Sequence, residues 1–314
     1  FMGVVAAAAA MFFIFNDSGG LDGRFIEDNY HLYGWLSGLG AIIFSTICIQ
    51  STWHYIPALI ERTSAKNDNL LRNIFATFNN KNFRYLVFLE TAVGGLGGVL
   101  SALLMVSFTY FWELDTLQIS ILFAGPPILA VIIVTGSSHF VNKRLEKQQL
   151  LQFSCIIGAL NLAWLTPLKL LGWLPQEAGI VFGLVFVNYA IFVTMSIMRT
   201  VANQALLADI ADEHELATGQ RQEGVMFAAA FFAAKFCAGF GYLVAGPFLD
   251  MIGLAAGAVP GETPESVALG LGIVMGPGLA LMMIVPIWMS LKLDASLAGQ
   301  LAVQKALNER AKTT

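Results

Sequence analysis

The sequence predicts an all-α protein that crosses a membrane several times, and three observations lead to this fold class. Hydrophobic residues make up 57% of the chain and charged residues only 12%, whereas soluble domains carry about 25% charged residues. Apolar segments of about 20 residues, the length that crosses a hydrocarbon core, recur along the chain. Most of these segments lack the polar face that a surface helix of a soluble protein carries.

We expect one partial and seven complete membrane spans. The partial span covers residues 1–15. Short connections that contain turn-forming residues, such as 16–20 and 260–262, separate the spans. The seven complete spans are 34–57, 83–110, 117–140, 149–172, 178–207, 225–249 and 266–291.

The distribution of lysine and arginine between the loops predicts the orientation, because cytoplasmic loops are richer in these residues. The poor side holds only Arg24 and Lys169. We therefore place the basic loops and the C-terminus in the cytoplasm, and the protein in the inner (plasma) membrane. The basic side holds Arg62, Lys66, Arg72, Lys81, Arg84, Lys143, Arg144, Lys147, Arg221, Lys292, Lys305, Arg310 and Lys312.

The longest basic loop, 58–82, is the natural boundary between two helix bundles. Residues 1–57 would end the first bundle, residues 83–291 would form a second bundle of six helices, and 292–314 would be a cytoplasmic tail. A transporter of two six-helix halves gives this pattern when the chain begins within its fifth helix. We therefore expect the sequence to be the C-terminal part of a longer protein.

Lys235 indicates a transport function more directly than any other residue. It lies near the middle of the apolar segment 225–249. A lysine at the centre of a lipid-facing helix costs roughly 2.5–3.5 kcal/mol, so such a residue normally faces a wet cavity inside the protein. We expect Lys235 to line a solute pocket. The alternative is a structural ion pair with a carboxylate elsewhere in the protein.

The segment that contains Lys235 resembles a known transporter family. Residues 207–215 read Leu-Ala-Asp-Ile-Ala-Asp-Glu-His-Glu, residues 218–224 read Thr-Gly-Gln-Arg-Gln-Glu-Gly, and Lys235 follows fourteen residues after Arg221. This order and spacing is similar to that of the glycoside–pentoside–hexuronide:cation symporters, the melibiose permease-like family of the major facilitator superfamily. The hydropathy pattern extends the resemblance over the whole chain, whereas the specific motifs lie within 205–240.

The resemblance implies a major facilitator fold. This chain would supply the C-terminal six-helix bundle and the last two helices of the N-terminal bundle. The cation-binding carboxylates and part of the sugar site would lie on helices one to early five, which we expect to be missing here, so that this part alone would not transport. Lys235 is the residue of that site that carries over.

Four further residues are candidates for the solute and cation sites. Arg199 lies at a depth similar to that of Lys235 on the preceding helix, and it either contacts the solute or pairs with an acid such as Glu90. Asn203 and Tyr189 share a polar stripe with Arg199, which either binds sugar hydroxyls or joins two helices. Glu90 is the candidate for cation coupling, and a structural role beside a basic residue is the alternative.

Asp209, Asp212, Arg221 and Glu223 lie at the ends of two helices that a short loop connects. From the resemblance, we expect these residues to form an ion-pair set that closes the cytoplasmic gate and breaks when the bundles rock apart. The alternative is a solvated loop with little energetic role, because exposed ion pairs contribute only about 0–1 kcal/mol.

These features together predict a secondary active transporter. It would move a sugar, glycoside or hexuronide together with Na⁺ or H⁺ by alternating access, without an enzymatic reaction. We expect no cofactor and no bound metal apart from the co-transported cation. The net charge of -4 argues against a nucleic-acid partner. The expected partners are the small-molecule solute and membrane lipid, and the expected state is a monomer.

Three alternatives differ in function. The first is a major facilitator transporter of an anionic amphipathic lipid or other organic anion, whose charged group Arg199 and Lys235 would hold. A membrane enzyme is a distant alternative, because the sequence contains no His-Glu-x-x-His or Gly-x-Ser-x-Gly motif. A sensor that does not transport would use the same fold.

Overall fold

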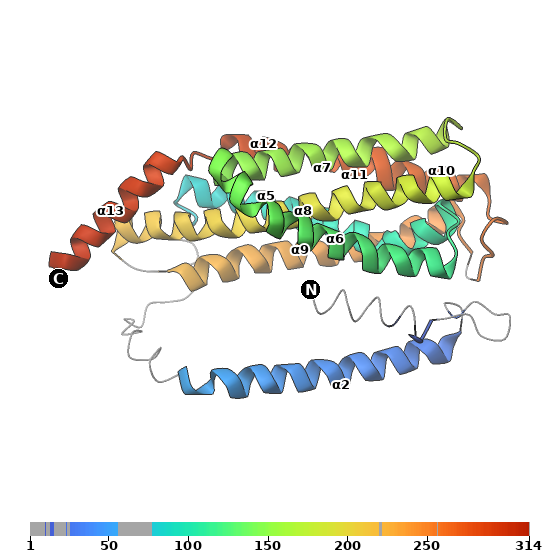
Figure 1. The fold of residues 1–314 in the computed structure, drawn as a ribbon, viewed down its shortest axis with the longest axis horizontal. Coiled ribbons are helices and arrows are strands. Elements are labelled where there is room, and N and C mark those ends of the chain that lie inside the picture. Colours follow the sequence, from blue (N-terminus) through green and yellow to red (C-terminus); the bar gives the residue numbers. More distant parts are fainter. Residues whose placement is uncertain are drawn as a thin grey trace. The chain divides into compact units, whose positions relative to one another are not determined.

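The computed structural model describes residues 10, 13–15, 23, 26–55, 77–219, 222–255 and 257–313 (Figure 1). The secondary structure of these residues is helical, and no β-strand occurs among them. The elements in chain order are α2 (Glu27–Thr52), η2 (Trp53–Tyr55), α5 (Lys81–Val106), η3 (Ser107–Phe111), α6 (Thr116–Arg144), α7 (Lys147–Leu170), α8 (Ala178–Thr218), α9 (Glu223–Ile252), α10 (Glu265–Ile273), η4 (Val274–Gly278), α11 (Leu279–Met282), α12 (Ile284–Lys292) and α13 (Leu297–Thr313).

The helices confirm the predicted fold class of an all-α membrane protein. In the described part of the chain, seven helical segments are long and apolar enough to cross a membrane. They overlap with the seven complete spans expected from the sequence. Most of the partial span 1–15 and of the loop 58–82 lies outside the described residues, and the predicted division at 1–57, 58–82, 83–291 and 292–314 stays a prediction.

Two boundaries differ from the sequence-based expectation. Helix α8 continues past residue 207 to Thr218. The apolar run ends near residue 207, but the polar residues that follow it remain helical. The helix ends at Gly219, whose φ of 72° is the left-handed conformation that glycine adopts easily at a helix end. At the other boundary, α12 extends to Lys292, the first residue of the predicted tail 292–314, and most of that tail forms α13.

The chain divides into two compact units by its internal contacts. Unit 1 consists of Phe1–Arg72 and Thr116–Ala124, and unit 2 of Asn73–Asp115 and Gly125–Thr314. In unit 1, no residue of α2 is buried. Such an apolar surface is stable in lipid or against further helices. Unit 2 contains all the predicted site residues.

Two apolar clusters hold unit 2 together. The larger cluster includes residues near the starts of α5, α7 and α9 and in the second half of α8, such as Phe83, Leu151, Leu207 and Met226. The smaller cluster joins η3, the end of α9 and α10. It consists of Phe111, Ile252, Val267 and Leu271. Leu96, Leu162 and Met283 of the larger cluster also line a cavity.

Helices α5 and α9 run parallel and touch through their backbones. Gly94 of α5 lies against Ala234, and Gly98 lies against Ala238 one turn further along both helices. A Cβ atom at either glycine would overlap the carbonyl oxygen of the facing alanine. Small residues at such positions permit the close approach that drives packing between membrane helices.

Two membrane segments change locally from α-helix to π-helix. The end of α5 continues into the π-helical turn η3, and α10 continues into η4, which contains Pro277. Lys169 of α7 donates a hydrogen bond to the Phe111 carbonyl of η3 and lies over the rings of Phe111 and Trp112, 4.9 and 5.1 Å from their centroids. This contact with the end of a helix gives a local reason for a lysine on the otherwise lysine-poor side.

The segment between α12 and α13 is fastened to the starts of α5 and α7. Asn82 donates a 2.9 Å hydrogen bond to the Asp294 carbonyl and accepts one of 3.1 Å from the Asp294 backbone N–H. Gln148 donates a 2.7 Å bond to the Leu293 carbonyl and accepts one of 3.1 Å from the Ala295 backbone N–H. The extended residues after α12 therefore have their backbone groups satisfied by side chains.

The α5–α9 contact gives the first testable expectation. Gly98→Ala places a methyl group against the Ala238 backbone, and we expect a loss of roughly 1–3 kcal/mol of stability, as for other overpacked sites. Gly97→Ala is the matched control, since a Cβ at Gly97 meets no atom within 4 Å. The melting temperature of the detergent-purified protein is the measurement. Equal melting temperatures for the two variants would contradict the close approach.

Candidate functional site

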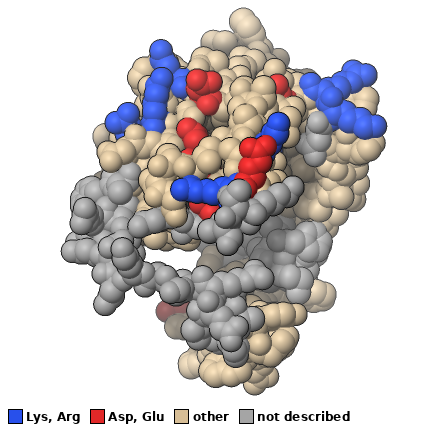
Figure 2. Space-filling model, turned by 90° about the vertical axis from the view of Figure 1, so that its left-hand side faces the viewer, with Lys and Arg blue, Asp and Glu red and all other residues tan. Residues whose placement is uncertain are grey.

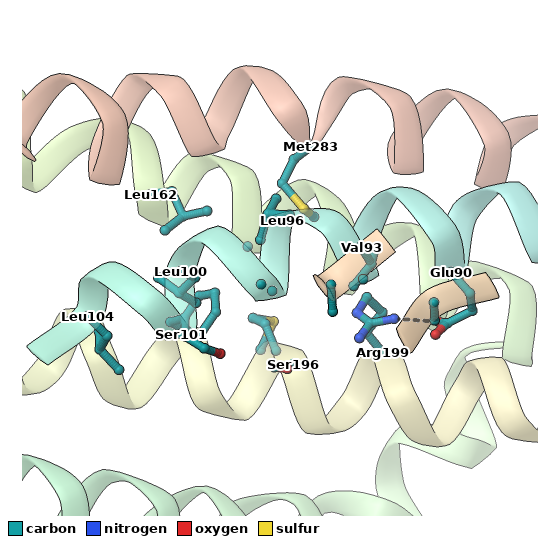
Figure 3. Close-up of a pocket in the computed structure, with 18 of the residues that line it drawn as sticks. Glu90, Val93, Leu96, Leu100, Ser101, Leu104, Leu162, Ser196, Arg199 and Met283 are labelled. Carbon is teal, nitrogen blue, oxygen red and sulfur yellow. Dashed lines mark hydrogen bonds and ion pairs between the residues drawn. The ribbon is translucent and has the colours of Figure 1, made fainter. Parts of the chain in front are cut away.

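Unit 2 contains a cavity of about 690 Å³ lined mainly by α5, α7, α8 and α9 (Figure 3). Most of its wall is apolar, with a few polar groups placed among them, as in many binding sites for small molecules. The polar and charged residues that line it are Glu90, Ser101, Ser154, Tyr189, Ser196, Arg199, Lys235 and Tyr242.

Each lining helix contributes residues at helical spacing. On α8 these are Tyr189, Phe192, Met195, Ser196 and Arg199. Residues three and four apart lie on one helix face, so that one stripe of α8 faces the cavity from its aromatic end to its charged end. The stripes of α5 and α9 follow the same rule, since α5 presents 90, 93, 97, 101 and 104, and α9 presents 231, 235, 238 and 242.

An ion pair joins two of these helices across the cavity wall. Arg199 Nη1 of α8 donates a 2.7 Å hydrogen bond to Glu90 Oε1 of α5, and Figure 3 shows the two side chains turned toward each other. The side chains are only 12% and 15% exposed. In a weakly polar environment, the pair satisfies two charges that would each be costly alone. Of the two roles that the sequence left open for Arg199, the pairing with Glu90 is present in the structure.

Lys235 reaches the same cavity from α9 and carries a charge that Glu90 does not neutralise. It forms no hydrogen bond or ion pair with a residue in the part of the chain that the structure describes. Among the lining residues, the charges of Glu90 and Arg199 cancel and that of Lys235 remains. The described wall of the cavity therefore has one net positive charge.

The predicted polar stripe of α8 divides between the cavity and the core. Tyr189 lines the cavity. Asn203 does not lie among the lining residues and is only 1% exposed. Asn203 lies one turn beyond Arg199, beside Ala202 and Leu206 of the large apolar cluster. The structure therefore assigns Asn203 to the packed core.

The predicted gate residues gather at the end of unit 2 that holds the starts of α7 and α9. Asp209 of α8 forms an ion pair with Lys147 of α7, with Nζ–O distances of 2.6 and 2.9 Å. Asp212 is half-buried on α8, and Glu223 lies in the first turn of α9, where a carboxylate is favoured by the helix dipole. Arg221 lies outside the described residues.

Basic and acidic side chains are intermixed on this end face, which Figure 2 shows from the left-hand side of Figure 1. The sequence-based reasoning used Lys147 only to predict orientation and did not recognise it as the partner of Asp209. It identified Tyr189, but it did not identify Ser101, Phe192 or Phe231 as cavity residues. The signal that could have found Ser101 is its spacing of eleven residues from Glu90, which returns to the same helix face after three turns.

Comparison with known proteins identifies the family. The family model described as MFS/sugar transport protein matches residues 1–295, which is most of the chain. The chain therefore belongs to this family of membrane transporters, in agreement with the helices of membrane length. A search of curated proteins gave no match.

The Glu90–Arg199 ion pair predicts how substitutions at these two residues change the stability of the folded protein. Glu90→Gln leaves the Arg199 guanidinium largely buried beside a neutral amide, and we expect a loss of roughly 3 kcal/mol, because removing one partner of a buried pair is strongly destabilising. The double variant Glu90→Gln with Arg199→Gln recovers much of this loss. Melting of the purified protein measures the cycle.

The control for this cycle is Glu262→Gln, because Glu262 is an exposed loop residue. It should leave the melting temperature unchanged. Strictly additive effects of Glu90→Gln and Arg199→Gln would contradict a coupled pair in the folded protein.

Proposed function

We propose that this MFS sugar transport protein is a symporter that moves a sugar, glycoside or hexuronide together with Na⁺ or H⁺ by alternating access. The observation that carries the proposal is the cavity, which places Glu90, Arg199 and Lys235 among helices of membrane length. Its volume of about 690 Å³ falls within the range of roughly 300–1,000 Å³ that is typical of small-molecule sites.

The chemistry of the wall suits a sugar. The aromatic rings of Tyr189, Phe192 and Phe231 offer flat apolar surfaces for the C–H faces of a pyranose ring. The hydroxyl groups of Ser101 and Ser196 provide donors and acceptors for the solute's hydroxyl groups. A few fixed polar groups on an otherwise apolar wall set orientation and specificity.

The ion pair offers a physical route for coupling. Glu90 balances the charge of Arg199 in the absence of solute. A proton or Na⁺ that binds Glu90 would compete with Arg199 and free the guanidinium to donate hydrogen bonds to the solute. Cation and solute would then favour each other's binding, and this favourable effect is reciprocal because it is a coupling free energy. In this scheme Lys235 contacts the solute or a carboxylate that also holds the cation.

A second ion pair has the properties of a gate. Lys147 is 42% exposed while its partner Asp209 is 9% exposed, so the lysine can turn to water when the pair separates. The pair can therefore open and re-form in each transport cycle when another cation or water takes the place of Lys147 beside Asp209. We assign Asp209, Lys147, Asp212, Arg221 and Glu223 to this gate. The basic loops support a cytoplasmic location for this end and for the C-terminus, in the inner membrane.

Uptake into proteoliposomes that contain the full-length protein tests the proposed function. The panel contains labelled neutral glycosides and hexuronides, each measured with a Na⁺ gradient, with a proton gradient and with neither. We expect uptake of at least one solute above its equilibrium level in the presence of a gradient. Lys235→Ala should abolish this accumulation, because it removes the unpaired charge of the cavity wall.

Lys305→Ala is the matched control, since Lys305 is exposed on α13, and it should transport like the original protein. If no glycoside or hexuronide is taken up under any gradient by correctly inserted protein, the sugar symporter assignment is wrong. If accumulation survives in Lys235→Ala, the role of Lys235 is wrong while symport itself stands.

A further inference from the structure

A second, small pocket adjoins the main cavity. It has a volume of about 60 Å³ and shares Leu104, Leu162, Tyr189 and Phe192 with the main cavity. Its other walls include Ser107 and Trp112, which lie further along the chain beyond the cavity stripe of α5. The small pocket therefore extends the line of the cavity toward the end of unit 2 that is opposite the Asp209–Lys147 pair.

The ring of Tyr189 lies at the junction of the two spaces. It contacts the edge of Phe108, with ring centroids 5.5 Å apart and an interplanar angle of 86°. On its other side it is nearly parallel to Phe192 on the same helix, at 6.3 Å and 12°. The hydroxyl forms no hydrogen bond with another residue in the described ranges. The ring, rather than the hydroxyl, makes the contacts that separate the two spaces.

The backbone beneath Tyr189 is held in place by the preceding residue. Asn188 Nδ2 donates a 2.9 Å hydrogen bond to the Asn161 carbonyl of α7, and Asn161 Nδ2 donates one of 2.9 Å to the Asn188 carbonyl. Two reciprocal bonds between neighbouring helices fix this turn of α8 inside an apolar environment. Movement at the junction is thus left to the Tyr189 side chain and to the helices opposite it.

Those opposite helices are irregular at this point. Ser107 and Phe108 belong to the π-helical turn η3, and Met275, which also lines the small pocket, belongs to the π-helical turn η4. Single π-helical turns are frequent at functional sites and are among the points where helices kink. Two of them border the same 60 Å³ space, and one also supplies the ring that contacts Tyr189.

We propose that Tyr189 is the gate between the solute cavity and the path toward the Trp112 end, and that the small pocket is the closed remainder of that path. This inference rests on the proposed transport function. In the conformation described here the ring closes the junction. Bending of α5 at η3 and of α10 at η4 withdraws Phe108 and Met275, which lets the ring turn aside and joins the two spaces. Tyr189 thereby controls passage by its size.

Thiol reactivity tests the gate without requiring a transported solute. The protein first has Cys48, Cys155 and Cys237 replaced by alanine, and a single cysteine is then placed in the small pocket as Ser107→Cys. Its reaction with methyl methanethiosulfonate is followed by mass spectrometry, with Tyr189 intact and in Tyr189→Ala. We expect the reaction to become faster by roughly tenfold or more, which corresponds to an opening step easier by about 1.4 kcal/mol.

Two comparisons make the result specific. Ser154→Cys reports on the main cavity, which Ser154 lines, and its reaction rate should not respond to Tyr189→Ala. Tyr189→Phe keeps the ring and should leave the Ser107→Cys rate low, whereas a role of the hydroxyl would make the phenylalanine variant behave like alanine. Tyr189→Leu replaces the alanine variant if melting shows that the latter is unfolded.

Equal reactivity of Ser107→Cys in the presence and absence of the Tyr189 ring would overturn the gate. A rise at Ser154→Cys equal to that at Ser107→Cys would also overturn it, because it would indicate general loosening of the bundle. A failure to find any sugar substrate would leave these rates unchanged, so the gate and the proposed function are tested separately.

Discussion

The cost of placing charge inside an apolar helix bundle governs the site. Glu90 and Arg199 meet this cost by pairing at 2.7 Å, and their contact joins α5 to α8 on two sides of the cavity. Lys235 carries a third charge without a described partner, and it is exposed where it lines the cavity, which fits a wall that is wet or receives a ligand. The pair thus has two roles, since it stabilises the bundle and also leaves the cavity with a single net positive charge.

The packing around the cavity combines rigid contacts with contacts that can move. The α5–α9 contact brings backbones together at Gly94 and Gly98, and such an interface has little freedom to slide. At one end, the ion pair between Asp209 and Lys147 has one member, Lys147, that is exposed enough to turn away to water. At the other end, π-helical turns replace regular helix beside Tyr189. Alternating access exposes one site first to one side of the membrane and then to the other. This requires rigid packing around the site and contacts at both ends that can open.

Much of the fold could be predicted from the sequence, because an apolar run long enough to cross a membrane has few other stable structures. Lys235 and Arg199 were identifiable as cavity residues for the same energetic reason. Apart from the pairing of Arg199 with Glu90, which the sequence offered as one of two roles, contacts between helices could not be predicted, since hydropathy does not say which faces meet. Asn203 illustrates this, because one helical turn separates the cavity wall from the core. The partner of Asp209 and the positions of the π-helical turns could not be predicted either, because they depend on three-dimensional packing and not on the spacing of residues in the sequence.

The most direct test of the central claim, that the solute binds in this cavity, is photo-crosslinking of a transported glycoside that carries a light-activated group, followed by peptide mapping. The account predicts attachment to the cavity stripes of three helices, at residues 96–104 of α5, 189–199 of α8 and 231–242 of α9, with loss of labelling when unlabelled solute is in excess. Attachment confined to exposed faces, such as that of α6 near Ile132, or labelling that excess solute does not reduce, would contradict it.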